Sequence, residues 1–185
     1  MMGRRAFASL LGLSIALSAG LSHAAGPVPE PDGYRMENYR SPVPETLKGA
    51  KVVTTEEVIA LWKNRKAVFI DVLPHDPKPE NLPAGTIWKE KTREDIPDSA
   101  WLVNVGYGVL NKETETYFRE GLRKLVGDDM HRAMVFYCMR DCWMSWNAAK
   151  RAVEMGYSGV LWYPLGTDGW AAAGQPTEKN VPFEF

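Results

Sequence analysis

The stretch "VFYCMRDCWMSWNAAKRAVEMGY", residues 135–157, decides the fold class of this 185-residue chain. Its apolar start is typical of a buried strand, and the segment from about Ser145 to Gly156 is typical of a helix that a glycine ends. Cys138 and Cys142, the two cysteines of the chain, lie in the turn between them. Parallel α/β sheets bind ligands at such turns, beyond the carboxyl ends of the strands. We therefore expect the functional site in this turn.

Strand and helix patterns alternate on both sides of that stretch. Thr54 and Glu57 predict a capping box at the start of a helix, and the apolar run before Pro74 predicts a buried strand that ends at Asp71. Further patterns predict a strand at 100–105, a helix at 115–127 that Gly127 ends, and a strand at 159–165 followed by a tight turn at 166–169. This order predicts an α/β domain with a mainly parallel sheet flanked by helices.

The first 24 residues have the pattern of a secretory signal peptide. Arg4 and Arg5 precede an apolar stretch, which a small-residue site at 22–24 follows. A membrane-spanning helix would need roughly 20 predominantly apolar residues, more than this stretch offers. We expect export to the periplasm and cleavage near Ala24 or Ala25, with no membrane span in the mature chain. The arginine pair leaves both the general and the twin-arginine export routes open.

The composition of the mature chain restricts its partners and its organisation. Loss of Arg4 and Arg5 leaves 20 basic against 23 acidic residues, so no basic surface for nucleic acid is expected. Residues 25–50 are rich in proline and predict an extended arm, in which Tyr34 and Tyr39 could act as anchors. We expect residues 51–185 to form one domain, interrupted by a proline-rich loop at 74–99 that is long enough to serve a function.

The position of Cys138 at a strand end has two interpretations. The helix that follows would direct its N-terminal amides at the turn, so the thiol would be reactive as a thiolate. Buried cysteines also serve as small apolar residues at such positions. A c-type haem attachment is excluded, because Trp143 stands where a histidine must follow the second cysteine.

The chain resembles a rhodanese domain over about residues 52–177. The segment 135–176 has the family's order of strand, cysteine, short loop, helix with an alanine pair, strand and Gly-x-x-x-Trp. The segments "TTEEVIALWKNRKAVFIDV" and "DIPDSAWL" are similar to its opening helix, its strand ending in Asp-Val and its Ile-Pro-Gly-Ala segment. The joined Cys and Trp, the proline-rich arm and "LPAGTIW" are similar to an exported rhodanese-like family associated with PQQ-dependent catabolism and named for a CxxCW motif, although three residues separate the cysteines here.

The resemblance implies sulfur transfer through Cys138, which would take a sulfane sulfur as a persulfide and pass it on. The loop amides from Met139 to Met144 would then bind the outer sulfur. The resemblance thus implies the following loop residues as substrate-binding: Met139, Arg140, Asp141, Trp143 and Met144. Sulfurtransferase loops usually carry basic residues and a glycine, whereas Asp141 here offsets Arg140. This departure weakens the case for thiosulfate as the donor.

Cys142 adds alternatives that the sequence leaves open. Cysteines four positions apart across a turn can meet the distance that a disulfide requires. The pair could cycle between dithiol and disulfide, or Cys142 could resolve a persulfide on Cys138. A permanent local disulfide and two free thiols are the other two possibilities. A non-catalytic binding module, with the arm and the loop as docking surfaces, is a further interpretation of the whole chain.

Few other residues are candidates for a role at the site. Asp71 could orient the active loop or an arginine such as Arg93, or it could be an ordinary surface or capping acid. Trp143 could wall the site or pack in the core. A zinc ion would need His75 to join both cysteines, so no metal is expected.

The resemblance also sets the expected partners. It implies a small sulfur donor or a thiol protein, and service to a periplasmic PQQ-dependent alcohol dehydrogenase or its cytochrome c. No cofactor is expected in this chain, and nothing in it indicates that it binds PQQ itself.

Overall fold

The computed structural model describes residues 26–75, 78–89 and 91–185, so the expected signal peptide at 1–24 lies outside the described residues. In chain order the elements are β1 (Lys51–Val52), α1 (Thr55–Lys63), β2 (Val68–Asp71), β3 (Arg93–Asp95), β4 (Ala100–Trp101), α2 (Lys112–Val126), β5 (Met134–Tyr137), α3 (Trp143–Glu154), β6 (Val160–Tyr163), α4 (Gly166–Ala172) and β7 (Glu178–Asn180). Within these residues, none of the helices has the length and apolar character needed to cross a membrane.

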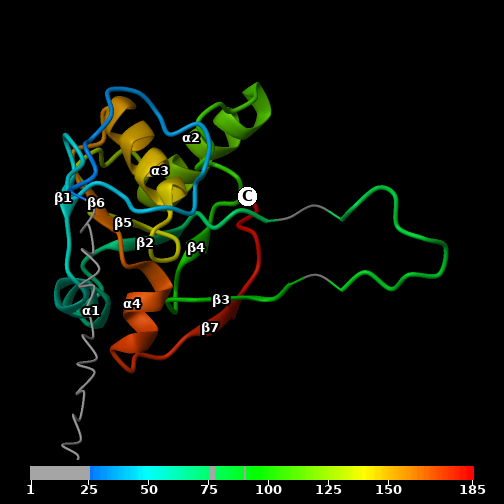
Figure 1. The fold of residues 1–185 in the computed structure, drawn as a ribbon. Coiled ribbons are helices and arrows are strands. Elements are labelled where there is room, and N and C mark those ends of the chain that lie inside the picture. The colour runs from blue at the N-terminus through cyan, green and yellow to red at the C-terminus, as the bar shows by residue number, and fades with distance from the viewer. Residues whose placement is uncertain (1–25, 76–77, 90) are drawn as a thin grey trace, which may run out of the picture.

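Five strands form the central sheet, in the order β1-β6-β5-β2-β4, and all neighbours are parallel. Helices α2 and α3 cover one face and α1 and α4 the other (Figure 1). The predicted α/β class with a parallel sheet flanked by helices is therefore confirmed. β3 and β7, which the sequence patterns did not predict, form a separate antiparallel pair, and β3 lies inside the segment expected to be a loop.

The alternation of side chains along β5 builds a core on each face of the sheet. Met134 and Phe136 are completely buried among α2 and α3, whereas Val135 and Tyr137 are buried on the side of α1 and α4. Because β5 is central, its carboxyl end lies deep in the molecule. The turn that carries the cysteines therefore starts from a buried position.

Several element bounds differ from the sequence-based expectation. The capping box of α1 forms as predicted, with Thr54 and Glu57 each accepting from the other's backbone amide. The strand expected at 100–105 ends at Trp101, where the chain turns away from the sheet. Residues 166–169 were expected to be a tight turn but form the first turn of α4.

Candidate functional site

A disulfide joins Cys138 to Cys142 in the turn between β5 and α3, with 6.3 Å between the Cα atoms. Cys138 directly follows β5, and Cys142 is the N-cap residue of α3. Cys138 is completely buried and Cys142 is 2% exposed. The structure therefore does not contain two free thiols, which were one of the possibilities that the sequence left open.

Helix α3 begins two residues earlier than the expected start near Ser145. Cys142 has an extended backbone, with φ −118° and ψ 104°, as N-cap residues usually do. Its side chain makes no capping hydrogen bond, because its sulfur is tied to Cys138. The hydroxyl of Ser145 donates instead to the carbonyl of Cys142, at 3.0 Å. The N-terminal end of α3 thus lies directly at the disulfide.

The start of α4 holds the cysteine turn from one side. The Cys138 carbonyl accepts from the backbone amide and the hydroxyl of Thr167, at 3.0 and 3.2 Å. A Cβ on Gly166, which has φ +50°, would lie 2.5 Å from that carbonyl oxygen. The carboxylate of Asp168 accepts from the backbone amide of Arg140 at 2.9 Å. The sequence pattern predicted that these α4 residues form a structural turn, and it gave no signal that they contact the cysteine turn.

The N-terminal arm covers the turn from the other side. Trp143 donates its backbone amide to the carbonyl of Tyr39 at 2.9 Å, and Ser41 donates to the carbonyl of Asp141 at 3.1 Å. Between these two bonds, Arg40 lies opposite Cys142 in an antiparallel bridge. The indole of Trp143 donates to Ser41 and to the carbonyl of Pro42. Trp143 therefore binds the arm as well as packing in the core.

The loop residues that the resemblance implies as substrate-binding have unequal access to solvent. Arg140 and Asp141 are exposed and Met139 is half-buried, whereas Trp143 and Met144 are buried. Two amides of the expected anion cradle already donate within the chain, Arg140 to Asp168 and Trp143 to Tyr39. A small anion would have to displace these two acceptors before it could use both amides.

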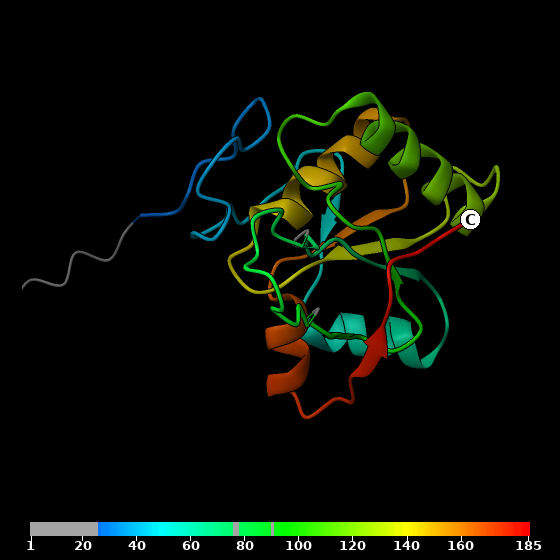
Figure 2. The ribbon, with the colours of Figure 1, turned by 90° about the vertical axis from the view of Figure 1, so that its right-hand side faces the viewer.

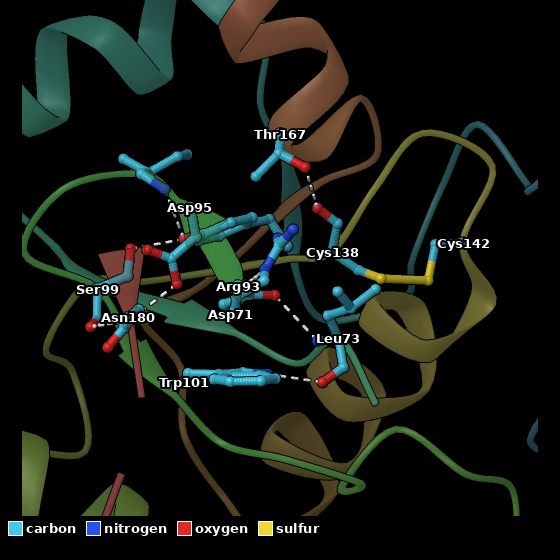
Figure 3. A network of polar contacts seen from close by, with 12 residues as sticks. Asp71, Leu73, Arg93, Asp95, Ser99, Trp101, Cys138, Cys142, Thr167 and Asn180 are labelled. Atoms are coloured by element: carbon cyan, nitrogen blue, oxygen red, sulfur yellow. Dashed lines mark hydrogen bonds and ion pairs between the residues drawn. A yellow bond between two sulfur atoms is a disulfide. The ribbon is translucent and has the colours of Figure 1, made fainter. Parts of the chain in front are cut away.

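Asp71 and Arg93 form a buried ion pair beside the turn (Figure 3). Asp71 is completely buried, so it is not the surface acid that the sequence left open. It also accepts from the backbone amide of Leu73 at 2.9 Å. Its strand partner is Tyr137, the residue before Cys138. The pair thus supports the ends of two neighbouring strands, β2 and β5, at the edge where the cysteine turn begins.

Sequence reasoning missed Asp95, a second buried carboxyl in this cluster. The amide of Asn180 donates to it at 2.8 Å, and the negative charge of Asp71 acts on it. Burial raises the pKa of Asp95 to about 7, while the Asn180 hydrogen bond opposes the rise. Burial also raises the pKa of Asp71, where the charge of Arg93 opposes it. Asp95 follows Arg93 by two residues on β3, so both side chains point inward, but three successive charged residues give no strand pattern that could have indicated this.

The remaining candidate is His75, which a zinc site would have required. His75 packs edge-on against Trp101, with 5.4 Å between the ring centroids. Among residues 26–75, 78–89 and 91–185, no group of three His, Cys, Asp or Glu side chains is arranged to hold a metal ion.

Comparisons with known proteins add little to this geometry. Neither the protein-family models nor the curated proteins give a match. A polysulfide-sulfur transferase homodimer from Wolinella succinogenes is similar in structure, with a TM-score of 0.44 and 17% identity over 70% of this chain and 79% of that one. A protein from Saccharomyces cerevisiae described as uncharacterized has a TM-score of 0.42 and 21% identity over 68% and 93%. Likenesses of this size carry no argument about activity, so membership of the rhodanese-like family stays a prediction.

Proposed function

We propose that this protein exchanges disulfides with partner thiols, using Cys138 and Cys142 as a reversible pair. The observation that supports this proposal is the disulfide itself, which lies at the carboxyl edge of a parallel sheet and at the N-terminus of a helix. A partner thiolate attacks one sulfur, the Cys138–Cys142 bond breaks, and the other cysteine leaves as a thiolate. A second thiol of the partner then displaces the mixed disulfide, so the partner loses two electrons and this protein gains them.

The end of α3 can stabilise the thiolate that this exchange produces. As the N-cap residue, Cys142 precedes the first-turn amides and the positive end of the helix dipole. The side chain of Cys142 caps none of these amides in the oxidised state, and the first of them, that of Trp143, donates to the Tyr39 carbonyl of the arm. Once the disulfide opens, a thiolate of Cys142 can accept from them, as cysteines at helix N-termini do. This supports reversible use of the pair over a permanent structural bridge.

Persulfide transfer through Cys138 is the second candidate, supported by its place at the strand end and by the sequence resemblance. The closeness of Cys142 gives this route a balanced resolving step. The Cys142 thiolate attacks the inner sulfur of a Cys138 persulfide, the disulfide forms, and the outer sulfur leaves as hydrogen sulfide. The acceptors already bound to Arg140 and Trp143 favour a neutral or protein-borne donor over the thiosulfate dianion.

The location and the partner system belong to the proposal as well. The leader pattern supports export to the periplasm, a compartment in which disulfides persist. The resemblance to the CxxCW family supports service to a PQQ-dependent alcohol dehydrogenase system. This service rests on sequence resemblance alone.

Reaction of the reduced protein with oxidised glutathione tests the proposal. The wild type should recover the internal disulfide and release two reduced glutathiones, whereas Cys138→Ser should stop at a glutathione adduct on Cys142, read by intact mass. No reaction in the folded protein would contradict the exchange.

Polysulfide added to reduced Cys142→Ser tests the second candidate, which predicts one extra sulfur atom on Cys138. If function in cells survives Cys138→Ser and is lost on deletion of the arm, the protein is a binding module instead.

A further inference from the structure

The N-terminal arm contacts the disulfide in the manner of a bound peptide. Residues 39–41 run antiparallel to residues 141–143, and the two backbone hydrogen bonds flank the facing pair Arg40 and Cys142. Both bonds use only main-chain groups. Any extended polypeptide can offer the same donor and acceptor, which is how peptide segments add to exposed backbone edges.

Arg40 and Cys142 are a facing pair of this antiparallel bridge. Residues that face each other in an antiparallel pair project to the same side, with Cβ atoms about 4.5 to 5.5 Å apart. A disulfide needs Cβ atoms about 3.5 to 4.5 Å apart. A small shift of the backbone would therefore let a cysteine in place of Arg40 form a disulfide with Cys142. Arg40 itself is exposed.

The two sulfur atoms differ in what encloses them. Cys138 is enclosed by the domain itself, at the end of a central strand and against the start of α4. Cys142 is covered on its outer side by the arm, through the bridge to Arg40. Displacement of the arm would uncover Cys142 first. The sulfur that faces a partner is therefore that of Cys142.

The arm covers much more of α3 than its N-cap residue Cys142. Helix α3 binds the arm through the indole of Trp146, which donates to Thr46, and through Asn147, which bonds both backbone groups of Arg35. The guanidinium of Arg151 lies 4.3 Å from the ring centroid of Tyr34. The arm thus contacts α3 from Trp143 to Arg151 and folds back on itself beside the start of the helix (Figure 2). A contact of this length fits a polypeptide and exceeds what a small thiol can use.

We propose that arm residues 39–41 occupy the binding site of the substrate, an extended polypeptide segment with a cysteine at the position of Arg40. The inference rests on the proposed function and names its substrate class. The substrate thiolate attacks the sulfur of Cys142, the bond to Cys138 breaks, and Cys138 leaves as a thiolate. A second substrate cysteine attacks the substrate sulfur of this mixed disulfide. The substrate leaves oxidised, and this chain keeps the two electrons and takes up protons as two thiols.

A cysteine placed in the arm of the full chain tests the geometry. Arg40→Cys should exchange internally, giving a disulfide between position 40 and Cys142 and a free Cys138, which peptide mapping after alkylation detects. Ser41→Cys is the matched control, because its side chain projects to the opposite side of the pair and should leave Cys138–Cys142 intact. Equal exchange from both positions, or none from position 40, would overturn the register on which the proposal depends.

Synthetic peptides that copy residues 34–46 then test the binding site. One carries a cysteine in place of Arg40 and the control carries it in place of Ser41. The acceptor chain is Tyr34→Ala, which removes the contacts of Tyr34 with Arg151 and Glu154 and loosens the arm. We expect the position-40 peptide to form a mixed disulfide on Cys142 about tenfold faster than the control, and about tenfold faster with Tyr34→Ala than with the wild type.

Glutathione distinguishes failure of the proposed substrate site from failure of the proposed exchange function. If glutathione opens the disulfide and the two peptides react equally, the substrate site is wrong while the exchange function stands. If neither glutathione nor a peptide opens it, both fail. Ser41→Pro provides a second loosened chain should Tyr34→Ala misfold, since it removes the amide that donates to Asp141.

Discussion

At the scale of single residues, the cluster of Asp71, Arg93 and Asp95 shows what sequence can and cannot reveal. Asp71 was singled out because an acid at the carboxyl end of a strand could orient the active loop or a nearby arginine. Asp95 was not, because β3 lies in a proline-rich segment without a strand pattern. Its partner Asn180 comes from β7, so no local signal could link the two. Burial of the whole cluster is a tertiary effect.

The raised pKa of Asp95 makes stability depend on pH in a defined direction. The folded-state value of about 7 lies above the ordinary 3.8, so folding favours the protonated form. This stabilisation is fully present below about pH 4 and is lost as the pH rises to 7, at up to about 1.4 kcal/mol per pH unit. Urea unfolding from pH 4 to 8 should show this fall in the wild type and a flatter profile in Asp95→Asn. If the free energy of unfolding falls equally with pH in both chains, Asp95 is not the group responsible for the fall.

Gly166 supplies a second test at this scale. An alanine there would hold a side chain at φ +50° and press its Cβ on the carbonyl of Cys138. We expect Gly166→Ala to cost about 1 to 3 kcal/mol in the free energy of unfolding and to speed opening of the disulfide, because the turn must shift. The matched control is Gly127→Ala, which also has positive φ but meets no atom within 4 Å of its Cβ. If Gly127→Ala lowers the free energy of unfolding as much as Gly166→Ala does, the contact with Cys138 is not the cause of the loss.

At the scale of elements, patterns of regular periodicity predicted the helices and strands that build the sheet. The expected segments at 115–127 and 159–165 correspond to α2 and β6, while the start of α3 was placed two residues late. The late start has a local reason, since a cysteine is not a usual N-cap residue and Trp143 carries no helix-start signal. Tyr34 anchors the arm on α3, as its sequence position allowed, but the backbone contacts of Arg35, Tyr39 and Thr46 with α3 could not be predicted, because backbone groups carry no sequence signal.

Asn147 is the central link between arm and domain. Its side chain bonds both backbone groups of Arg35 and the carbonyl of Gly106, and it is completely buried. Asn147→Ala should cost about 2 to 4 kcal/mol in the free energy of unfolding and expose the amide of Trp143 to hydrogen exchange. Arg119→Ala, which removes one exposed ion pair within α2, is the control and should cost less than about 0.5 kcal/mol. Unchanged exchange at Trp143 in Asn147→Ala would contradict the role of this link.

At the scale of the whole molecule, we expect the fold to form without its disulfide. The sheet and its two cores bury large apolar side chains on both faces, including Trp146, Trp162 and Trp170. The bridge closes a sequence separation of only four residues, so its entropic contribution is about 2 kcal/mol. Reduced wild type and Cys138→Ser should keep the native circular dichroism spectrum and lose about that much stability. Global unfolding on reduction would mean that the bridge is structural.

The measurement that most directly tests reversible exchange is the redox equilibrium of the pair in the folded protein. The native chain is equilibrated in glutathione buffers of graded ratio, alkylated, and weighed intact. The account predicts a two-electron titration with a midpoint above roughly −300 mV, the range of exchanging rather than structural disulfides. A pair that stays oxidised in every buffer until the protein unfolds would contradict the account and leave Cys138–Cys142 as a static bridge.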